Sequence, residues 1–500
     1  MTPARGCGTC RDRRVLCDRA VPVCQRCVQS RRTCSGYGVR LSWPGSKRRT
    51  RSKPESALAH ARASGPFYKV DWLNTSFADI EMYYDTAYTG PKPMRGGSWG
   101  RPNLPLGLPA TSWMPFKLDD EQKRLCDYFE TAASRSLPTF GYDSKAMCSV
   151  ILPMAMSDHS ASSTAVLLSL LALAALHRDG PQHQAARLKL GALRALEASV
   201  LEDSSTKDLL GHVAAGMLLC SYEIQKSTKT SAHWLWYLCG AMTIIKSGHL
   251  DRPNQDGNIT LLLGWTQYYV TMARFSLRHW MRSDTMEFAF ARDVGYHDVM
   301  PPVCTRSSIE GLNDAPHKLL DLLGRVIDTV VEDTKPHYHS KDYRQGVEGL
   351  ESTLTSADSP WRVSQPSPGS TSTGDANSME LFRLTGLVYL GRAAESILRH
   401  PTQLDNWISQ AFNILAGLEV FRYPLPLLIL GCEARTDEQR MMVLGIIDRT
   451  LENAPTVSIT YVKSMVRFLW VHDDLIDDNR GYLSKLSAAI SSSQALPIFI

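Results

Sequence analysis

Half of the chain's twelve cysteines lie within 28 residues near the N-terminus, and their spacing is a repeat. The pattern is Cys, two residues, Cys, six residues, Cys, and it occurs twice with a shift of 17 residues. The two copies are Cys7, Cys10, Cys17 and Cys24, Cys27, Cys34. Thiolates are ligands of structural zinc, which takes four ligands in a tetrahedron. The repeat therefore predicts two equivalent metal-binding halves with one zinc ion each.

The number of available ligands adds a constraint to this prediction. Two zinc ions need eight ligand positions, whereas residues 1–53 offer six thiolates and contain no histidine. Six thiolates fill eight positions only if two of them bridge both metals, and symmetry favours an equivalent pair. Three disulfides are the alternative use of the same cysteines. The sequence has no secretory signal pattern, so reduced thiols and metal are expected instead.

The charge of the chain is concentrated at the same end. Residues 1–53 contain 14 Lys and Arg against two acids, a net of +12, while the remainder has 41 basic and 48 acidic residues, a net of −7. A strongly basic segment on a mildly acidic body indicates a polyanion as the partner of the N-terminus. This segment has few apolar residues, so metal binding is expected to supply its folding free energy.

The segment from Cys7 to Cys34 resembles the fungal binuclear zinc cluster family of transcription factors. The likeness includes the basic run after the second cysteine, the Asp after the third, and Pro22 between the halves. It implies that Cys7 and Cys24 are the bridging ligands of two Zn²⁺ ions. It also implies a nuclear, DNA-binding regulator of RNA polymerase II genes that works with the transcription machinery, with fungal metabolic or secondary-metabolite pathways as the expected targets.

In that family the short helix after the second cysteine enters the DNA major groove at a CGG-type triplet. Cys10 and Cys17 are seven residues apart, so a helix of two turns would place both thiols on one face and the arginines between them outward. Carried over by position, the base-reading pair is Arg13 and Arg14. The phosphate contacts are expected from Arg11, Arg19 and Arg26. Leu16 departs from the family, which usually has Lys there, and puts the usual triplet preference in question.

The segment after the cluster is interpreted as a linker that begins with a basic run. Lys47, Arg48, Arg49, Arg51 and Lys53 are typical of a nuclear import signal or a phosphate-contacting arm. Between Pro54 and Pro115, Pro and Gly recur and no apolar heptads are sustained, which argues against a dimerising coiled coil. A homodimer, if formed, would use the body of the chain. The longest apolar run has 12 residues, short of the about 20 that cross a bilayer, so no membrane is expected.

From about residue 118 the pattern becomes helical. Apolar residues follow i, i+3, i+4, i+7 spacing from Leu210 to Leu218 and from Leu319 to Val330. Residues 160–177 are apolar on nearly every face, which predicts a central buried helix. The predicted fold class is a small metal-stabilised zinc cluster of two short helices with loops, followed by a large all-α domain. The expected boundaries are 1–40 for the cluster, 41–117 for the linker and 118–500 for the helical domain, with a disordered insertion near 355–377.

A second resemblance covers the body. The segments His233–Ala241 and Tyr423–Arg440 are similar to the α-helical fungal-specific transcription factor domain. That resemblance implies a regulatory domain without catalytic chemistry of its own.

An enzyme is the alternative class, because Asp473, Asp474 and Asp477 fit the Asp-Asp-x-x-Asp pattern of all-α prenyl-diphosphate enzymes. Such carboxylates can hold Mg²⁺ and a diphosphate. A second acidic helix usually lies well downstream, and only 23 residues follow Asp477. The pattern is therefore interpreted as a solvated acidic face or an acidic-hydrophobic activation patch, and the chain as a non-enzyme. A scaffold that binds only protein is a weaker third reading.

Overall fold

The computed structural model describes two compact units, residues 1–70 and 71–500, which are taken separately. In the first, the described residues are 9, 10, 13, 15–18, 20, 24–30, 32 and 34. In the second, they are 118–500 without 138, 201–204, 227–232, 253–256, 281–308, 310, 334, 337, 357–372, 399–400, 455, 476–480 and 494–495.

The N-terminal unit repeats its backbone geometry along with its cysteines. Thr9 and Cys10 are helical, and α2 spans Gln25–Gln29. In the first half, Arg13 N–H donates to Thr9 O (3.2 Å) and Val15 N–H to Cys10 O (3.0 Å). In the second half, the residues 17 positions later make the same bonds, Ser30 to Arg26 O (3.2 Å) and Arg32 to Cys27 O (3.0 Å). The sequence repeat is therefore also a structural repeat.

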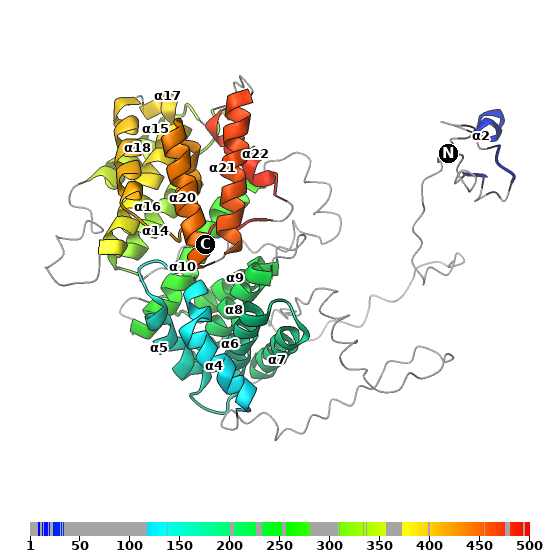
Figure 1. The fold of residues 1–500 in the computed structure, drawn as a ribbon, viewed down its shortest axis with the longest axis vertical. Coiled ribbons are helices and arrows are strands. Elements are labelled where there is room, and N and C mark those ends of the chain that lie inside the picture. Colours follow the sequence, from blue (N-terminus) through cyan, green and yellow to red (C-terminus); the bar gives the residue numbers. More distant parts are fainter. Residues whose placement is uncertain are drawn as a thin grey trace. The chain divides into compact units, whose positions relative to one another are not determined.

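The second unit is a bundle of helices, and no strand occurs among its described residues. Figure 1 shows a first group from α4 to α9 and a second group from α14 to α22. The helices of the first group and α10 are α4 (Asp120–Thr131), the 3₁₀ helix η2 (Ala133–Ser136), α5 (Ser144–Ala155), α6 (Ala161–Asp179), α7 (His183–Val200), α8 (Thr206–Lys226), α9 (His233–Ser247) and α10 (Gly257–Trp280). The second group comprises α14 (Ala315–Thr329), α15 (Lys341–Thr355), α16 (Thr373–Ala393), α17 (Glu395–Leu398), α18 (Pro401–Ala416), α19 (Pro424–Cys432), α20 (Asp437–Asn453), α21 (Val457–Leu475) and α22 (Tyr482–Ser491). The expected all-α body is confirmed.

Helix α6 is the predicted central helix. Ser160 begins it as the N-cap, with its Oγ accepting from Ser163 N–H (3.1 Å), and Gly180 ends it with a φ of 77°, which glycine adopts without strain. From Ala165 to Leu176 every residue is buried. Among the described helices, α6 is the one long and apolar enough to cross a membrane by length and composition. Its burial against α4, α5, α7 and α8 is what a core helix of a bundle shows.

Helix α10 joins the two groups. It contacts α8 and α9 on one side and α14 and α22 on the other, and every residue from Leu261 to Trp280 except Arg278 is buried. At its end the buried His279 ring bonds Ser487 Oγ on α22 through Nδ1 and Tyr389 OH on α16 through Nε2, both at 2.9 Å. Polar groups thus fix α10 against the second group where apolar packing alone would leave its rotation free.

The other sequence expectations for the body fall mostly on described residues. The periodic segments 210–218 and 319–330 lie in α8 and in α14 with the residue that follows it. For the expected insertion near 355–377, α15 extends to Thr355 and α16 begins at Thr373, while residues 357–372 lie outside the described part of the chain.

Candidate metal centre

The buried core of the described N-terminal residues consists of cysteine side chains. Cys10, Cys24 and Cys27 are fully buried, and the partly buried side chains packed against them are Val15, Cys17 and Cys34. The Cys10 sulfur lies 3.7 Å from that of Cys24 and 3.9 Å from that of Cys27, well beyond the about 2.05 Å of a disulfide. Closely packed thiols without a disulfide length between them are the donor set that zinc prefers.

The sulfur atoms form two overlapping groups. Cys10, Cys17 and Cys24 have their sulfurs within 4.8 Å of one another, and so do Cys24, Cys27 and Cys34. Cys24 belongs to both groups, as a ligand shared by two metals must. Its proposed counterpart, Cys7, lies outside the described residues. The residues present therefore fit a zinc cluster in which one thiolate serves both halves.

The N-terminus of α2 positions the second half of the cluster. Cys24 is the N-cap of α2, and its sulfur accepts from Cys27 N–H at 3.3 Å. The Asp18 carboxylate accepts from the backbone N–H of Gln25 (2.9 Å) and of Arg26 (3.2 Å), and these bonds lower the pKa of Asp18 below its usual range. A charged acceptor at a helix N-terminus stabilises the orphan N–H groups there. Asp18 thereby ties the end of the first half to the start of the second.

The helix after Cys10 is shorter than the sequence argument assumed. Residues 15–18 are not helical, so two helical turns do not bring Cys17 to the metal side, and that expectation is wrong. Val15 N–H bonds a carbonyl five residues back, that of Cys10, which closes the helix with a wider turn. Cys17 reaches the other sulfurs through this turn and the non-helical residues around it.

Two of the five expected DNA-contacting arginines lie on described residues, and both are exposed. Arg26 is on α2, and Arg13 follows the first helix, where its Nη1 donates to Ser30 Oγ at 3.1 Å. Ser30 Oγ itself donates to Arg26 O at 2.6 Å. The sequence reading missed Ser30, although the repeat places it 17 residues after Arg13 and so on the equivalent turn. Leu16 is 88% exposed, so its side chain is presented to solvent where the family usually has a cation.

The other basic residues that the sequence predicts to contact DNA or to serve nuclear import lie outside the described part of the chain. They are Arg11, Arg14, Arg19, Lys47, Arg48, Arg49, Arg51 and Lys53.

Two aspartates of the acidic pattern near the C-terminus, Asp473 and Asp474, form ion pairs. Asp474 accepts a two-pronged contact from Arg440 (2.7 and 2.9 Å), which lowers the pKa of that carboxyl. Asp473 Oδ1 accepts from Lys485 Nζ at 2.9 Å, and Asp477 lies outside the described residues. Each of the two described aspartates is thus paired with a cation, Asp474 with Arg440 on α20 and Asp473 with Lys485 on α22.

Comparison with known proteins agrees with both parts of this architecture. Residues 5–44 match the fungal Zn(2)-Cys(6) binuclear cluster domain, and residues 124–486 match the fungal specific transcription factor domain. No solved structure gives a significant match.

Curated relatives are transcriptional regulators. Transcription factor iacI of Pestalotiopsis fici is 34% identical over 399 residues, covering 79% of this chain and 99% of the relative. Arginine metabolism regulation protein II of Saccharomyces cerevisiae is 53% identical over 38 residues, 8% of this chain and 4% of its own length. An uncharacterized transcriptional regulatory protein of Schizosaccharomyces pombe is 53% identical over 32 residues, 6% of each chain. The two short matches are about as long as the cluster domain, whereas the first covers most of the chain. The chain therefore belongs to the fungal Zn(2)-Cys(6) binuclear cluster transcription factors that carry a fungal specific transcription factor domain.

Proposed function

We propose that this protein is a nuclear, sequence-specific DNA-binding regulator of RNA polymerase II genes that reads a GC-rich, CGG-like triplet. The observation that carries the proposal is the pair of overlapping sulfur groups that share Cys24. A metal cluster of this kind fixes the backbone that bears Arg13 and Arg26, both exposed. Fungal metabolic or secondary-metabolite genes are the proposed targets.

The metal assignment rests on the two sulfur groups and on the family resemblance, which supplies the bridging pair. One Zn²⁺ would be held by Cys7, Cys10, Cys17 and Cys24, and the other by Cys24, Cys27, Cys34 and Cys7, with Cys7 and Cys24 as the shared ligands. When bound, the zinc ions supply structural cross-links and no reaction step. The chain's own contribution is to keep the thiolates together through the α2 cap and the Asp18 bonds.

The basic residues of the N-terminal segment are assigned three roles: reading bases, contacting phosphates and nuclear import. Arg13 and Arg14 read base edges in the major groove, because an arginine fork matches O6 and N7 of guanine. Arg11, Arg19 and Arg26 contact phosphates and fix the register. Lys47, Arg48, Arg49, Arg51 and Lys53 serve nuclear import and add phosphate contacts. The net charge of +12 in residues 1–53 supports this division.

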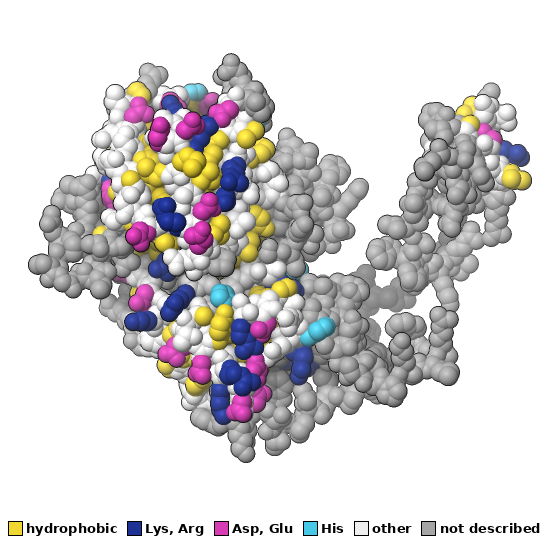
Figure 2. Space-filling model, viewed as in Figure 1, with side chains coloured by type: hydrophobic (Ala, Val, Ile, Leu, Met, Phe, Trp, Pro, Cys, Tyr) yellow, Lys and Arg dark blue, Asp and Glu magenta, His cyan; other side chains and the backbone are white. Residues whose placement is uncertain are grey.

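The rest of the chain is assigned to regulation. We place the cluster in residues 1–40, the linker in 41–117 and the regulatory helical domain in 118–500, and we assign the chain no catalytic role. The helical domain contacts the transcription machinery and forms a homodimer. Met441 on α20 and Phe468 and Val471 on α21 are exposed apolar side chains on two helices that pack against each other, and they support the homodimer. Figure 2 shows hydrophobic side chains on this face of the helical unit.

DNA binding by the full-length protein tests the proposal. We expect tight binding to a duplex with a CGG triplet, a steep loss of affinity with salt, and loss of binding on zinc chelation. Arg13→Ala should reduce discrimination between CGG and a scrambled triplet by roughly tenfold, since one such contact is worth ~1–3 kcal/mol. Fluorescence anisotropy at several salt concentrations measures this.

The matched control is Arg467→Ala, an exposed arginine on α21 of the helical unit, which should leave discrimination unchanged. A protein that holds two zinc ions per chain and yet binds CGG and scrambled duplexes equally well would contradict sequence-specific regulation.

A further inference from the structure

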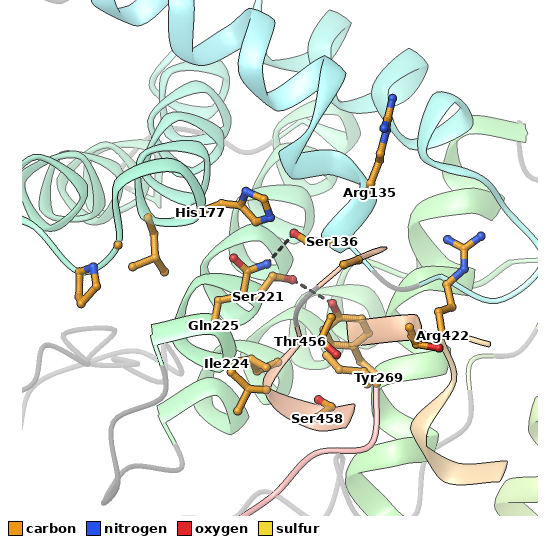
Figure 3. Close-up of a pocket in the computed structure, with 17 residues that line it drawn as sticks. Arg135, Ser136, His177, Ser221, Ile224, Gln225, Tyr269, Arg422, Thr456 and Ser458 are labelled. Atoms are coloured by element: carbon orange, nitrogen blue, oxygen red, sulfur yellow. Dashed lines mark hydrogen bonds between the residues drawn. The ribbon is translucent and has the colours of Figure 1, made fainter. Parts of the chain in front are cut away.

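A cavity of about 280 Å³ lies inside the helical unit, between the two groups of helices. The first side is formed by η2, the C-terminal end of α6, α8 and α10. The second side is formed by the segment before α19, the end of α20 and the start of α21, as Figure 3 shows. Its size is near the lower end of the range of ligand pockets, which suits a small metabolite.

The lining combines apolar walls with neutral hydrogen-bonding groups. Leu176, Ile224 and Val457 contribute apolar surface, and most of the exposed lining area is apolar. The polar lining side chains are Ser136, His177, Ser221, Gln225, Tyr269, Thr450, Thr456 and Ser458. A few convergent polar groups on apolar walls are the usual composition of a small-molecule site.

Contacts between these groups define what they offer a ligand. Ser221 Oγ donates to Met217 O at 3.0 Å, so in its contact with Tyr269 (3.0 Å) the tyrosine hydroxyl is the donor. Tyr269 is fully buried and uses its hydroxyl proton on Ser221, so it has no proton left to donate to a ligand. Gln225 donates one N–H to Ser136 Oγ at 2.7 Å, a contact that uses none of its carbonyl oxygen.

His177 provides a donor on the same side of the cavity as Gln225. Its Nδ1 lies 3.0 Å from Tyr128 OH, and burial lowers the pKa of the imidazole. A neutral ring that accepts from the Tyr128 hydroxyl at Nδ1 has its proton on Nε2. In Figure 3 the ring lies beside Ser136 and Gln225. The lining residues therefore include a donor, His177, and an acceptor, the carbonyl of Gln225, which fits hydroxyl or carbonyl groups on a bound molecule.

The charged side chains that line the cavity are both positive, and the terminal carboxylate of Ile500, which also belongs to the lining, is the one negative group beside them. Arg135 and Arg422 are both exposed and belong to the lining, and none of the lining side chains is a carboxylate. The two arginines come from opposite sides of the cavity, Arg135 from η2 and Arg422 from the segment before α19. In Figure 3 both guanidinium groups lie on the same side of the view, so they mark a rim rather than the interior. An anionic group at this rim would gain from both charges.

We propose that this cavity binds a small organic acid, a compact apolar molecule that carries a carboxylate together with hydroxyl or carbonyl oxygens. Its apolar part lies against Leu176, Ile224 and Val457, its oxygens meet His177 and Gln225, and its carboxylate lies at Arg422. Because the two walls come from different helix groups, the bound acid holds the groups together. Its binding then raises the stability of the helical unit by mass action.

Ligand-observed NMR on the full-length protein tests the site with defined probes. The probes are 4-hydroxybenzoate, 4-hydroxyphenylacetate and 3-hydroxyhexanoate, each compared with its own amide at millimolar concentration. We expect saturable binding of at least one acid, with an affinity about two- to fivefold above that of its amide, as an exposed ion pair gives. Arg422→Gln should abolish this preference while leaving the amide's affinity unchanged, and Arg467→Gln is the matched control outside the cavity.

Filling the cavity gives a second readout. Ile224→Trp should remove binding of acid and amide alike while circular dichroism stays that of the parent protein. If this variant does not fold, the Arg422→Gln result decides, because that side chain is exposed and its loss leaves the core intact. Three acids without saturable binding, or equal binding of acid and amide, overturn the proposal. Repeating the titration after zinc chelation separates it from DNA recognition, since the cavity belongs to the helical unit alone.

Discussion

At the scale of single residues, the surroundings of two histidines, His212 and His177, lower the pKa of their side chains. His212 on α8 is buried and its Nε2 bonds Ser199 Oγ on α7. Burial lowers the pKa of His212, with Asp208 acting in the opposite direction, and burial also lowers the pKa of His177. Both side chains therefore favour the neutral form in the folded protein.

This preference predicts a pH dependence of stability. In the unfolded chain these histidines titrate near about 6.5, whereas in the folded chain they bind protons only at lower pH. The unfolded state thus binds more protons below pH 6.5, so stability is full above that value and falls as the pH drops towards the folded pKa values. The denaturant concentration at the unfolding midpoint should therefore be lower at pH 5.5 than at pH 7.5.

The His212→Gln variant keeps a hydrogen-bonding group and removes one titration, so its decrease between these two pH values should be smaller than that of the parent protein. Carboxyl groups with strongly lowered pKa values, such as Glu121 with a pKa of about 2, titrate below pH 5.5. They therefore do not contribute to the difference between the two pH values. Equal pH slopes in both proteins would show that His212 is not a source of the effect.

At the scale of elements, α7 and α8 share an ion pair in the core. Lys189 Nζ lies 2.6 Å from Glu223 Oε1, with the side chains 1% and 2% exposed. The same ammonium lies 5.6 Å from the centre of the Tyr222 ring. Each charge is tolerated at this depth because the other is present.

Removing one partner should therefore cost far more than removing both. We expect Lys189→Met or Glu223→Leu alone to lower the free energy of unfolding by about 3–5 kcal/mol, and the double variant to recover most of the loss. The control is Lys123→Met, which breaks the exposed pair with Asp120 and should cost at most about 1 kcal/mol. Urea unfolding followed by circular dichroism measures all four variants, and strictly additive losses would argue against a coupled pair.

The elements also show how far the sequence could be read. Spacing of like residues predicted the sulfur cluster, the buried helix α6 and the amphipathic segments of α8 and α14, because these signals are local. It did not single out α10, whose buried polar residues, including Gln267, Arg274 and His279, interrupt an apolar pattern. Nor could it show that Asp474 meets Arg440 or that the cavity exists, since both depend on pairings between distant helices. The length of the helix after Cys10 was misjudged for a related reason, because the wide turn at Val15 has no marker such as Gly or Pro.

At the scale of the whole molecule, the face formed by α20 and α21 is where we place the homodimer contact. Met441 is 67% exposed, Val471 57% and Phe468 42%, and Figure 2 shows hydrophobic side chains gathered over these helices. Exposed apolar side chains that lie together often mark interaction sites. The Arg440–Asp474 ion pair joins α20 to α21 beside them, so the surface is held in one arrangement.

Replacing this apolar surface should separate the two copies. We expect the Phe468→Ser/Val471→Ser variant to be monomeric at concentrations where the parent protein is dimeric, with unchanged helical content, because little buried surface is lost. Light scattering coupled to size-exclusion chromatography measures the mass. Val200→Ser, which changes an exposed valine at the end of α7, is the control, and a parent protein that is monomeric throughout the accessible concentration range would refute the contact.

The burial of α10 between both groups of helices limits how this fold can change during evolution. A chimaera that takes one helix group from this chain and the other from a distant relative would inherit an α10 suited to only one of its neighbours. His279 alone would need its two hydroxyl partners, Ser487 and Tyr389, to arrive together. Recombination inside the helical unit should therefore be rare among functional descendants. Joining the whole helical unit to a different DNA-binding module, in contrast, leaves every one of these contacts intact.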